Sequence, residues 1–341
     1  MNLAAKYRPK VFEDVTEQPL VVDILRNMCK DEKLETRNFL LVGSAGCGKT
    51  TLARICGNIL NDNKGEPIEI DAASHSGVDD MRQIVSQAQQ YPIGTKWKIF
   101  ILDECHALSN QSWQAALKIL EEQPAKSIFF FCTTNPEKIP GTILSRVQKF
   151  QLSKISLSGI ESRLKYIIEC ENKEGRHITF TDDSIQMIAK LANGGMRDAI
   201  TLMDKALAYS EDLTIENLEK SLDMPNYDDY FEFLNSLARK DNTKIIDIIN
   251  TVYNSGTNYV KWMENFHSFI CNIIKYIFLQ DITKTMIPST YQEKISKYST
   301  QHAVLCLKLA NKLVKLNQEL KSTQYLQEYT ISELCEIPIQ K

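Results

Sequence analysis

Short apolar runs alternate with segments in which apolar residues recur every three or four positions across the first 150 residues. Continuous apolar runs of this length predict buried strands, and the three-to-four spacing predicts amphipathic helices. Strands that alternate with helices indicate an α/β domain, a parallel sheet with helices on both faces. One expected strand begins at Asn38, and the others cover 67–71, 98–103 and 128–133. The expected helices cover 19–30, 50–60, 78–90 and 109–122, and Pro124 ends the last of them.

The pattern becomes entirely helical after residue 155. Segments 157–170, 181–192, 196–209 and 214–222 predict a small helical bundle, interrupted by Asn193-Gly-Gly195. Longer helices with clustered aromatic residues are expected from about Pro225 onward. We therefore expect three domains, at residues 1–155, 156–224 and 225–341. The aromatic residues of the last domain are expected to pack in its core rather than to stack on bases: Phe231, Phe233, Trp262, Phe266, Phe269, Tyr276 and Phe278.

Composition narrows the class of protein. The 341 residues are 43% hydrophobic, and the formal net charge is -3, which argues against nucleic-acid binding over the whole surface. No apolar run approaches the roughly 20 residues of a membrane helix, and no signal-peptide pattern opens the chain, so we expect a cytoplasmic protein. The nine cysteines contain no C-x-x-C pair and are expected to be reduced thiols.

The first apolar run leads into a glycine-rich loop and then a helix. Gly43, Gly48, Lys49 and Thr50 satisfy the pattern G-x-x-x-x-G-K-[ST]. Glycines let backbone N–H groups approach phosphate oxygens, the lysine reaches the β- and γ-phosphates, and the hydroxyl holds Mg²⁺. A glycine turn before an ordinary helix is the alternative. Cys47, inside the loop, is expected to be sensitive to alkylation.

Two acids, Asp103 and Glu104, end the strand at 98–103. Acids at the carboxyl end of a parallel strand lie where α/β sheets bind ligands. Asp103 is expected in the Mg²⁺ shell, and Glu104 is expected to orient or deprotonate the attacking water. Alone, the pair is better explained as a solvated strand end. With the phosphate loop, it predicts an NTPase.

Near the start of the chain, Pro9 interrupts any helix, so Tyr7 and Arg8 are expected on an irregular segment. Two interpretations of this segment are open: it lies over the nucleotide base, or it forms a surface turn, which is the more common role of such residues.

Several further motifs follow in one order, and together they carry a family resemblance. The chain resembles the ATPase subunits of sliding-clamp loaders, which are AAA+ proteins, and most closely the gamma/tau subunits of bacterial DNA polymerase III. The matching stretches are Lys6–Pro9, Gly43–Thr51 (including Ser44, Ala45 and Gly46), Glu69–Ser74, Val78–Arg82, Leu102–Ser109, Ala116–Glu122, Thr133–Pro136, Ile143–Phe150 and Gly194–Ile200. They cover most of residues 1–225.

The resemblance implies an AAA+ P-loop ATPase domain, a helical lid and an all-α collar that assembles subunits. It implies ATP and Mg²⁺ as ligands, and other loader subunits in a pentameric ring, a sliding clamp and primer–template DNA as partners. Thr134 resembles sensor 1, which contacts the γ-phosphate or its water. Arg197 resembles sensor 2, and Arg146 resembles the arginine finger that completes a neighbouring subunit's ATP site.

The chain departs from the family pattern at three places. Val147 replaces the usual cysteine after Arg146. The zinc-binding cysteine module is missing, because a short polar turn joins Leu60 to Ile68, so no zinc is expected. The tail by which tau forms bind polymerase and helicase is also expected to be absent. These departures suggest a compact loader, and a phage is one source that would fit them.

The helix expected at 78–90 carries candidates for macromolecular contacts. Ser74, His75, Ser76 and Arg82 are expected to contact DNA phosphates, because helix N-termini and arginine suit such contacts. Met81 and Ile84 are expected to enter a clamp pocket if that edge is exposed, or to pack on the sheet if it is not. Two other functions remain open: a DNA-remodelling motor of the Holliday-junction or helicase-loader type, and a non-catalytic scaffold.

Overall fold

A computed structural model describes residues 2–31, 34–122, 126–222, 224, 226–256 and 258–335. It divides into two compact units. The first holds the residues up to His177 together with Ile188–Asp204, and the second holds Ile178–Met187 together with the residues from Lys205 onward. The helices expected in a separate lid are thus shared between the units, and the three-domain division stays a prediction. Pro225, expected at a domain boundary, and Pro124 lie outside the described residues.

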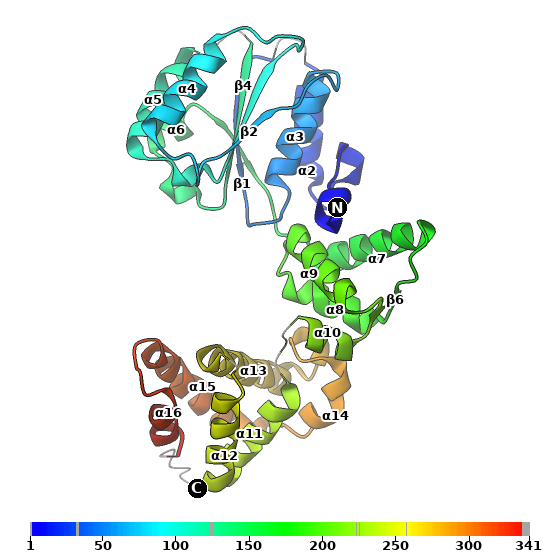
Figure 1. The fold of residues 1–341 in the computed structure, drawn as a ribbon, viewed down its shortest axis with the longest axis vertical. Helices are drawn as coiled ribbons and strands as arrows, with labels where there is room; N and C mark the ends of the chain where they lie inside the picture. The colour runs from blue at the N-terminus through cyan, green and yellow to red at the C-terminus, as the bar shows by residue number, and fades with distance from the viewer. Residues whose placement is uncertain are drawn as a thin grey trace. The chain divides into compact units, whose positions relative to one another are not determined.

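A five-stranded parallel sheet forms the centre of the first unit (Figure 1). Its order, β2-β3-β4-β1-β5, puts β1 between β4 and β5. Every residue of β1 and β4 is buried, as expected of central parallel strands. The last strand, β5, was not among those expected from the sequence, because its pattern is mostly polar. The strands are β1 (Asn38–Val42), β2 (Ile68–Asp71), β3 (Lys98–Asp103), β4 (Ser127–Thr133) and β5 (Gln148–Gln151).

Helices cover both faces of this sheet, as predicted (Figure 1). Alternate residues of a strand point to opposite faces. Phe39 and Leu41 therefore pack with α2 and α3, whereas Leu40 and Val42 pack with α4 and α5. The unit's helices are α1 (Leu3–Lys6), α2 (Pro19–Cys29), α3 (Lys49–Leu60), α4 (Val78–Gln89), α5 (Asn110–Glu122), α6 (Gly141–Leu144) and α7 (Leu157–Lys173), with short 3-10 turns at Phe12–Asp14, Cys105–Ala107 and Pro136–Lys138.

Two further helices cross the division between the units. They are α8 (Asp182–Leu191) and α9 (Met196–Tyr209), and α9 begins at the residue after the expected glycine break.

The second unit is helical, apart from the paired short strands β6 (Thr179–Phe180) and β7 (Asp212–Leu213). Aromatic rings fill its core, where Phe231 and Phe269 meet edge to face with centroids 4.9 Å apart. Six of the seven aromatic residues named above are buried, which confirms the packing prediction, but Phe278 is 62% exposed. Its helices are α10 (Ile215–Ser221), α11 (Tyr227–Arg239), α12 (Asn242–Asn254), α13 (Tyr259–Leu279), α14 (Gln292–Ile295), α15 (Thr300–Leu320) and α16 (Leu326–Cys335), with 3-10 turns at Ile282–Lys284 and Ser289–Tyr291.

Across the ranges that the structure describes, no helix combines the length and the apolar character needed to cross a bilayer.

Candidate nucleotide site

The glycine-rich loop connects β1 to α3 and has the backbone geometry that its sequence predicts. Gly46 and Gly48 have φ angles of +70° and +108°, in the left-handed region that favours glycine. A side chain at Gly43 would place its Cβ 2.7 Å from the Cys47 Sγ and 3.0 Å from the Leu152 carbonyl oxygen. Gly46 and Gly48 therefore favour glycine because of their backbone conformation, and Gly43 favours glycine because a side chain there has no space.

The ammonium group of Lys49 is suited to bind an anion in this loop. Its ammonium group is buried and donates to the Gly43 and Ser44 carbonyl oxygens, both at 3.0 Å. Carbonyl groups solvate the ammonium but do not neutralise it, and a buried charge without a counter-charge is costly. A phosphate group supplies that counter-charge, so the donor set suits a nucleotide.

Cys47 does not fit the expected sensitivity to alkylation. It is 2% exposed, and burial raises the pKa of its thiol despite the nearby Lys49 charge. Alkylation requires an accessible thiolate, so both features lower the reactivity of this residue.

The two expected metal-binding residues lie in contact. The Thr50 Oγ1 donates to the Asp103 Oδ2 at 2.8 Å, and the other carboxylate oxygen accepts from the Glu104 N–H at 3.0 Å. A hydroxyl and a carboxylate are ligands that suit Mg²⁺, which usually retains water and substrate phosphates in its shell. No group of three or more His, Cys, Asp or Glu side chains in the described part of the chain is arranged to hold a metal ion.

Glu104 follows β3 in a left-handed conformation, with φ +46°. This conformation costs conformational free energy in residues other than glycine, and such strain concentrates at functional sites. The Thr134 hydroxyl donates to the Glu104 Oε2 at 3.0 Å, so the structure brings together the residues expected as water activator and sensor 1. His106 Nδ1 lies 3.2 Å from the same oxygen and 3.1 Å from the Thr133 Oγ1. His106 was not among the residues expected at the site, although its place two residues after Glu104 was a signal.

The backbone around Arg197 contacts the phosphate loop. The N–H of Met196, the first residue of α9, donates to the Gly46 carbonyl oxygen at 3.0 Å. A Cβ on Gly46 would lie 3.0 Å from the Gly195 Cα and 3.3 Å from the Arg197 nitrogen. The start of α9 therefore touches the loop, which places Arg197 beside the nucleotide site.

The N-terminal segment is fixed to the same unit by polar contacts. Arg8 Nε donates to the Thr51 Oγ1 at 3.3 Å, next to the phosphate loop, and burial lowers the pKa of Arg8. The Tyr7 hydroxyl donates to the Glu171 Oε1 on α7 at 2.7 Å, and burial together with this carboxylate raises the pKa of Tyr7 to about 12. Lys6 binds the same Glu171 oxygen at 2.6 Å. Tyr7 and Arg8 are thus held by contacts with their own chain, and their position over the nucleotide base stays a prediction.

Arg146 lies at the opposite edge of the sheet from Lys49. Lys49 follows the carboxyl end of β1, whereas Arg146 precedes the amino end of β5, and the two strands are parallel neighbours. Its guanidinium contacts Glu121 at 2.6 Å and has no contact with its own chain's phosphate loop in the described ranges. Arg146 is therefore not part of its own chain's nucleotide site.

The candidates for DNA contact are mostly exposed. Ser74, His75 and Arg82 are accessible, and Ser76 is half-buried. Arg82 forms an exposed ion pair with Asp79 at 2.9 Å, so part of its charge is already neutralised. Nothing in this geometry tests DNA contact, which stays a prediction.

The clamp candidates do not have the exposed edge that their assignment required. Met81 is 2% and Ile84 is 7% exposed, because both pack against the sheet. The alternative expectation, packing on the sheet, describes these two side chains. The face of α4 that points away from the sheet carries polar residues instead.

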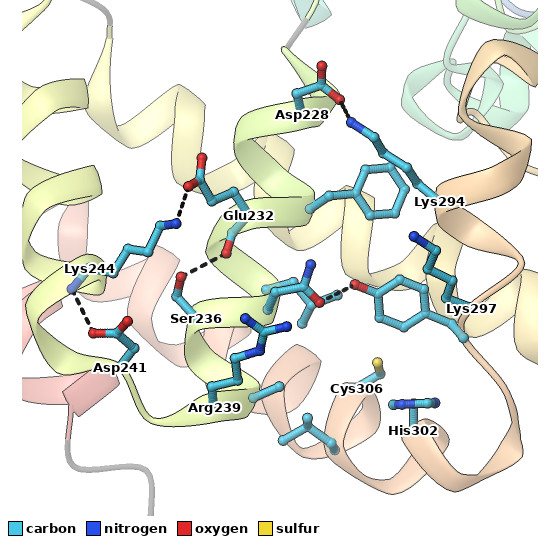
Figure 2. A pocket seen from close by; sticks show the side chains of 16 residues that line it. Asp228, Glu232, Ser236, Arg239, Asp241, Lys244, Lys294, Lys297, His302 and Cys306 are labelled. Carbon is cyan, nitrogen blue, oxygen red and sulfur yellow. Dashed lines mark hydrogen bonds and ion pairs between the residues drawn. The ribbon is translucent and has the colours of Figure 1, made fainter.

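A cavity of about 650 Å³ lies in the second unit, between α11 and the segment that leads into α15 (Figure 2). Its wall includes Asp228 and Lys294, which form an ion pair, and Glu232 and Lys244, which form another at 2.5 Å. None of its lining residues belongs to the phosphate loop or to the acids after β3. The nucleotide chemistry predicted from the sequence is therefore not located in this cavity.

Two family models match the chain. One is described as DNA polymerase III, delta subunit, and matches residues 54–156. The other, described as DNA polymerase III clamp loader subunit, ATPase lid domain, matches residues 159–212. The DNA polymerase III subunit gamma of Buchnera aphidicola subsp. Schizaphis graminum is 30% identical, over 93% of this chain and 92% of its own. The chain belongs to the DNA polymerase III gamma/tau family.

Some relatives in the gamma/tau family are much longer than this chain. The Bacillus subtilis DNA polymerase III subunit tau is 35% identical over 71% of this chain but only 49% of its own. The chain thus spans about half or less of the length of several tau relatives. Among solved structures, the RuvB Holliday junction branch migration motor of Thermotoga maritima has a TM-score of 0.52 and 18% identity, covering 74% of this chain and 86% of its own. This likeness shows a similar fold and nothing more.

Proposed function

We propose that the chain is an ATPase subunit of a sliding-clamp loader, which uses ATP to open a ring-shaped clamp and close it on primer–template DNA. The observation that carries the ATPase proposal is the convergence of Lys49, the Thr50–Asp103 pair and the Glu104–Thr134 pair at one edge of the sheet. Membership in the gamma/tau family supports the loader function. The motor alternative is supported only by a fold likeness at 18% identity.

The proposed reaction is attack of water on the γ-phosphorus of ATP, which breaks the bond to the β-phosphate bridging oxygen and releases ADP and phosphate. Lys49 and the loop N–H groups hold the phosphates, and Glu104 orients the water and accepts its proton. Thr50 and Asp103 would hold Mg²⁺, whose charge stabilises the phosphate oxygens. Thr134 positions Glu104 and reports the γ-phosphate. No covalent intermediate is required.

Arg146 is proposed to act in a neighbouring subunit's site, since it lies at the edge of the sheet away from its own loop. Its guanidinium is always charged and forks onto phosphate oxygens. Trans-supplied arginines accelerate comparable NTPases roughly 10³–10⁵-fold. Hydrolysis is therefore expected to depend on assembly with other loader subunits, the clamp and primed DNA.

The test mixes subunits that carry Arg146→Ala with subunits that carry Lys49→Ala and measures steady-state ATPase with clamp and primed DNA. Each variant alone is expected to lose the stimulated activity. Mixed rings contain interfaces with an intact Lys49 and an intact neighbouring Arg146, so part of the activity should return. If native mass spectrometry shows mixed rings and no activity returns, or if Arg146→Ala keeps full activity, the trans assignment is wrong.

A further inference from the structure

The guanidinium of Arg146 is held by three groups of its own chain. Nη2 lies 2.6 Å from the Glu121 Oε1, and Nη1 donates to the Thr142 carbonyl oxygen at 2.6 Å and to the Ser145 Oγ at 3.1 Å. Glu121 is its only charged partner among the residues that the structure describes. We propose that Glu121 is a positioning residue, which holds Arg146 in the orientation needed to bind a neighbour's γ-phosphate.

The contacts leave a usable edge on the guanidinium. An arginine has five N–H donors in a fixed plane. The three contacts are made by Nη1 and Nη2, and Nε has no contact with a residue that the structure describes. The Nε–H group is therefore available to donate to a phosphate oxygen. Arg146 is therefore able to bind a phosphate without releasing Glu121.

The position of Glu121 is unusual for a glutamate. It lies in the last turn of α5, which contains no basic residue, and the negative end of a helix dipole disfavours a carboxylate. The adjacent Glu122 has an ordinary surface contact, 3.8 Å from Lys118 on the same helix. Glu121 instead reaches across to the segment that joins α6 to β5. Its partner is the residue that the proposed function places in the neighbour's active site.

Orientation, rather than stability, is the expected consequence of this ion pair. The side chains of Arg146 and Glu121 are 35% and 52% exposed, and pairs of this kind contribute little to folding. A free arginine must give up its rotamer freedom when it binds the transition state, and Glu121 restricts that freedom in advance. Loss of this restriction is expected to lower stimulated turnover about tenfold, with little change in the subunit's own ATP affinity.

The inference rests on the proposed trans function of Arg146, and the experiment separates the two. Stimulated kcat and ATP Kd are measured for rings that carry Glu121→Ala, Glu121→Gln or Arg146→Ala, and the double variant Glu121→Ala with Arg146→Ala. Glu122→Ala is the matched control, because Glu122 is 55% exposed in the same turn. Urea unfolding checks that every variant folds.

Glu121→Ala is expected to lower kcat about tenfold, Glu121→Gln to retain part of the activity through its amide oxygen, and Glu122→Ala to have no effect. The double variant should be no slower than Arg146→Ala, because Glu121 acts only through that residue. If Arg146→Ala loses activity while Glu121→Ala equals or exceeds the unchanged chain, or if the two losses add, only the positioning role is overturned. If Arg146→Ala keeps full activity, the trans function and the positioning role both fail.

Discussion

Gly46 is the phosphate-loop residue that contacts the start of α9. Replacing it with alanine tests what that contact contributes to nucleotide binding. The residue has φ +70°, and its added Cβ would meet two backbone atoms, the Gly195 Cα at 3.0 Å and the Arg197 nitrogen at 3.3 Å. Backbone atoms cannot rotate away as a side chain can. The loop must therefore shift away from α9, or the α9 start must move.

The magnitude follows from the conformation. A left-handed alanine costs about 1–2 kcal/mol relative to the favoured regions, and the close contacts add to that cost. If the empty loop relaxes and must return to its original shape to bind phosphate, the binding free energy of ATP becomes less favourable by this amount. The expected result of Gly46→Ala is therefore an ATP Kd raised about 5–30-fold.

Gly94→Ala is the matched control. Gly94 has φ +76°, close to that of Gly46, but a Cβ there meets nothing within 4 Å. It is expected to lower the free energy of unfolding by about 1–2 kcal/mol without changing ATP affinity. Both variants are titrated with a fluorescent ATP analogue and Mg²⁺ and unfolded with urea. A Gly46→Ala chain that binds ATP within about twofold of the unchanged chain would refute the reasoning.

Three further outcomes are expected. Glu104→Gln should keep ATP binding and lower turnover about 10²–10⁴-fold, and a turnover near that of the unchanged chain would remove Glu104 from the mechanism. Met81→Asp should lower the free energy of unfolding by at least about 2 kcal/mol in urea, whereas Gln83→Asp, at an exposed position of the same helix, should not; equal stabilities would contradict the burial of Met81. Glu171→Gln should lose about 1.5–3 kcal/mol of unfolding free energy at pH 7. Burial alone would raise the pKa of Glu171, but its hydrogen bonds from Lys6, Tyr7 and Arg176 lower it overall. The stabilisation from the charged Glu171 is therefore fully present above the ordinary glutamate pKa of about 4.3, and it is lost as pH falls through the lower pKa of the folded state. Urea unfolding from pH 7 to pH 3 checks this, and a difference between the two chains that does not shrink in acid would count against it.

The sequence by itself determined the phosphate loop, the acids after β3 and the α/β order of the first unit. These features depend on short stretches, because glycine spacing, apolar runs and helical periodicity are local properties. The carboxyl ends of parallel strands meet at one edge of a sheet. For that reason the contact between Thr50 and Asp103, which are far apart in the sequence, was also predictable.

Only the tertiary structure decided whether the apolar stripe of α4 is buried and which distant side chains meet. Met81 and Ile84 form an apolar stripe that would suit either a clamp or the sheet, and the packing of α4 buries them. His106 reaches Glu104 because a 3-10 turn follows the acid, and no periodic pattern marks that turn. Glu121 meets Arg146 because α5 ends beside the segment before β5, a polar strand whose pairing with β1 the sequence did not indicate. Side-chain pairs of this kind depend on how strands and helices are ordered in space, which local patterns do not encode.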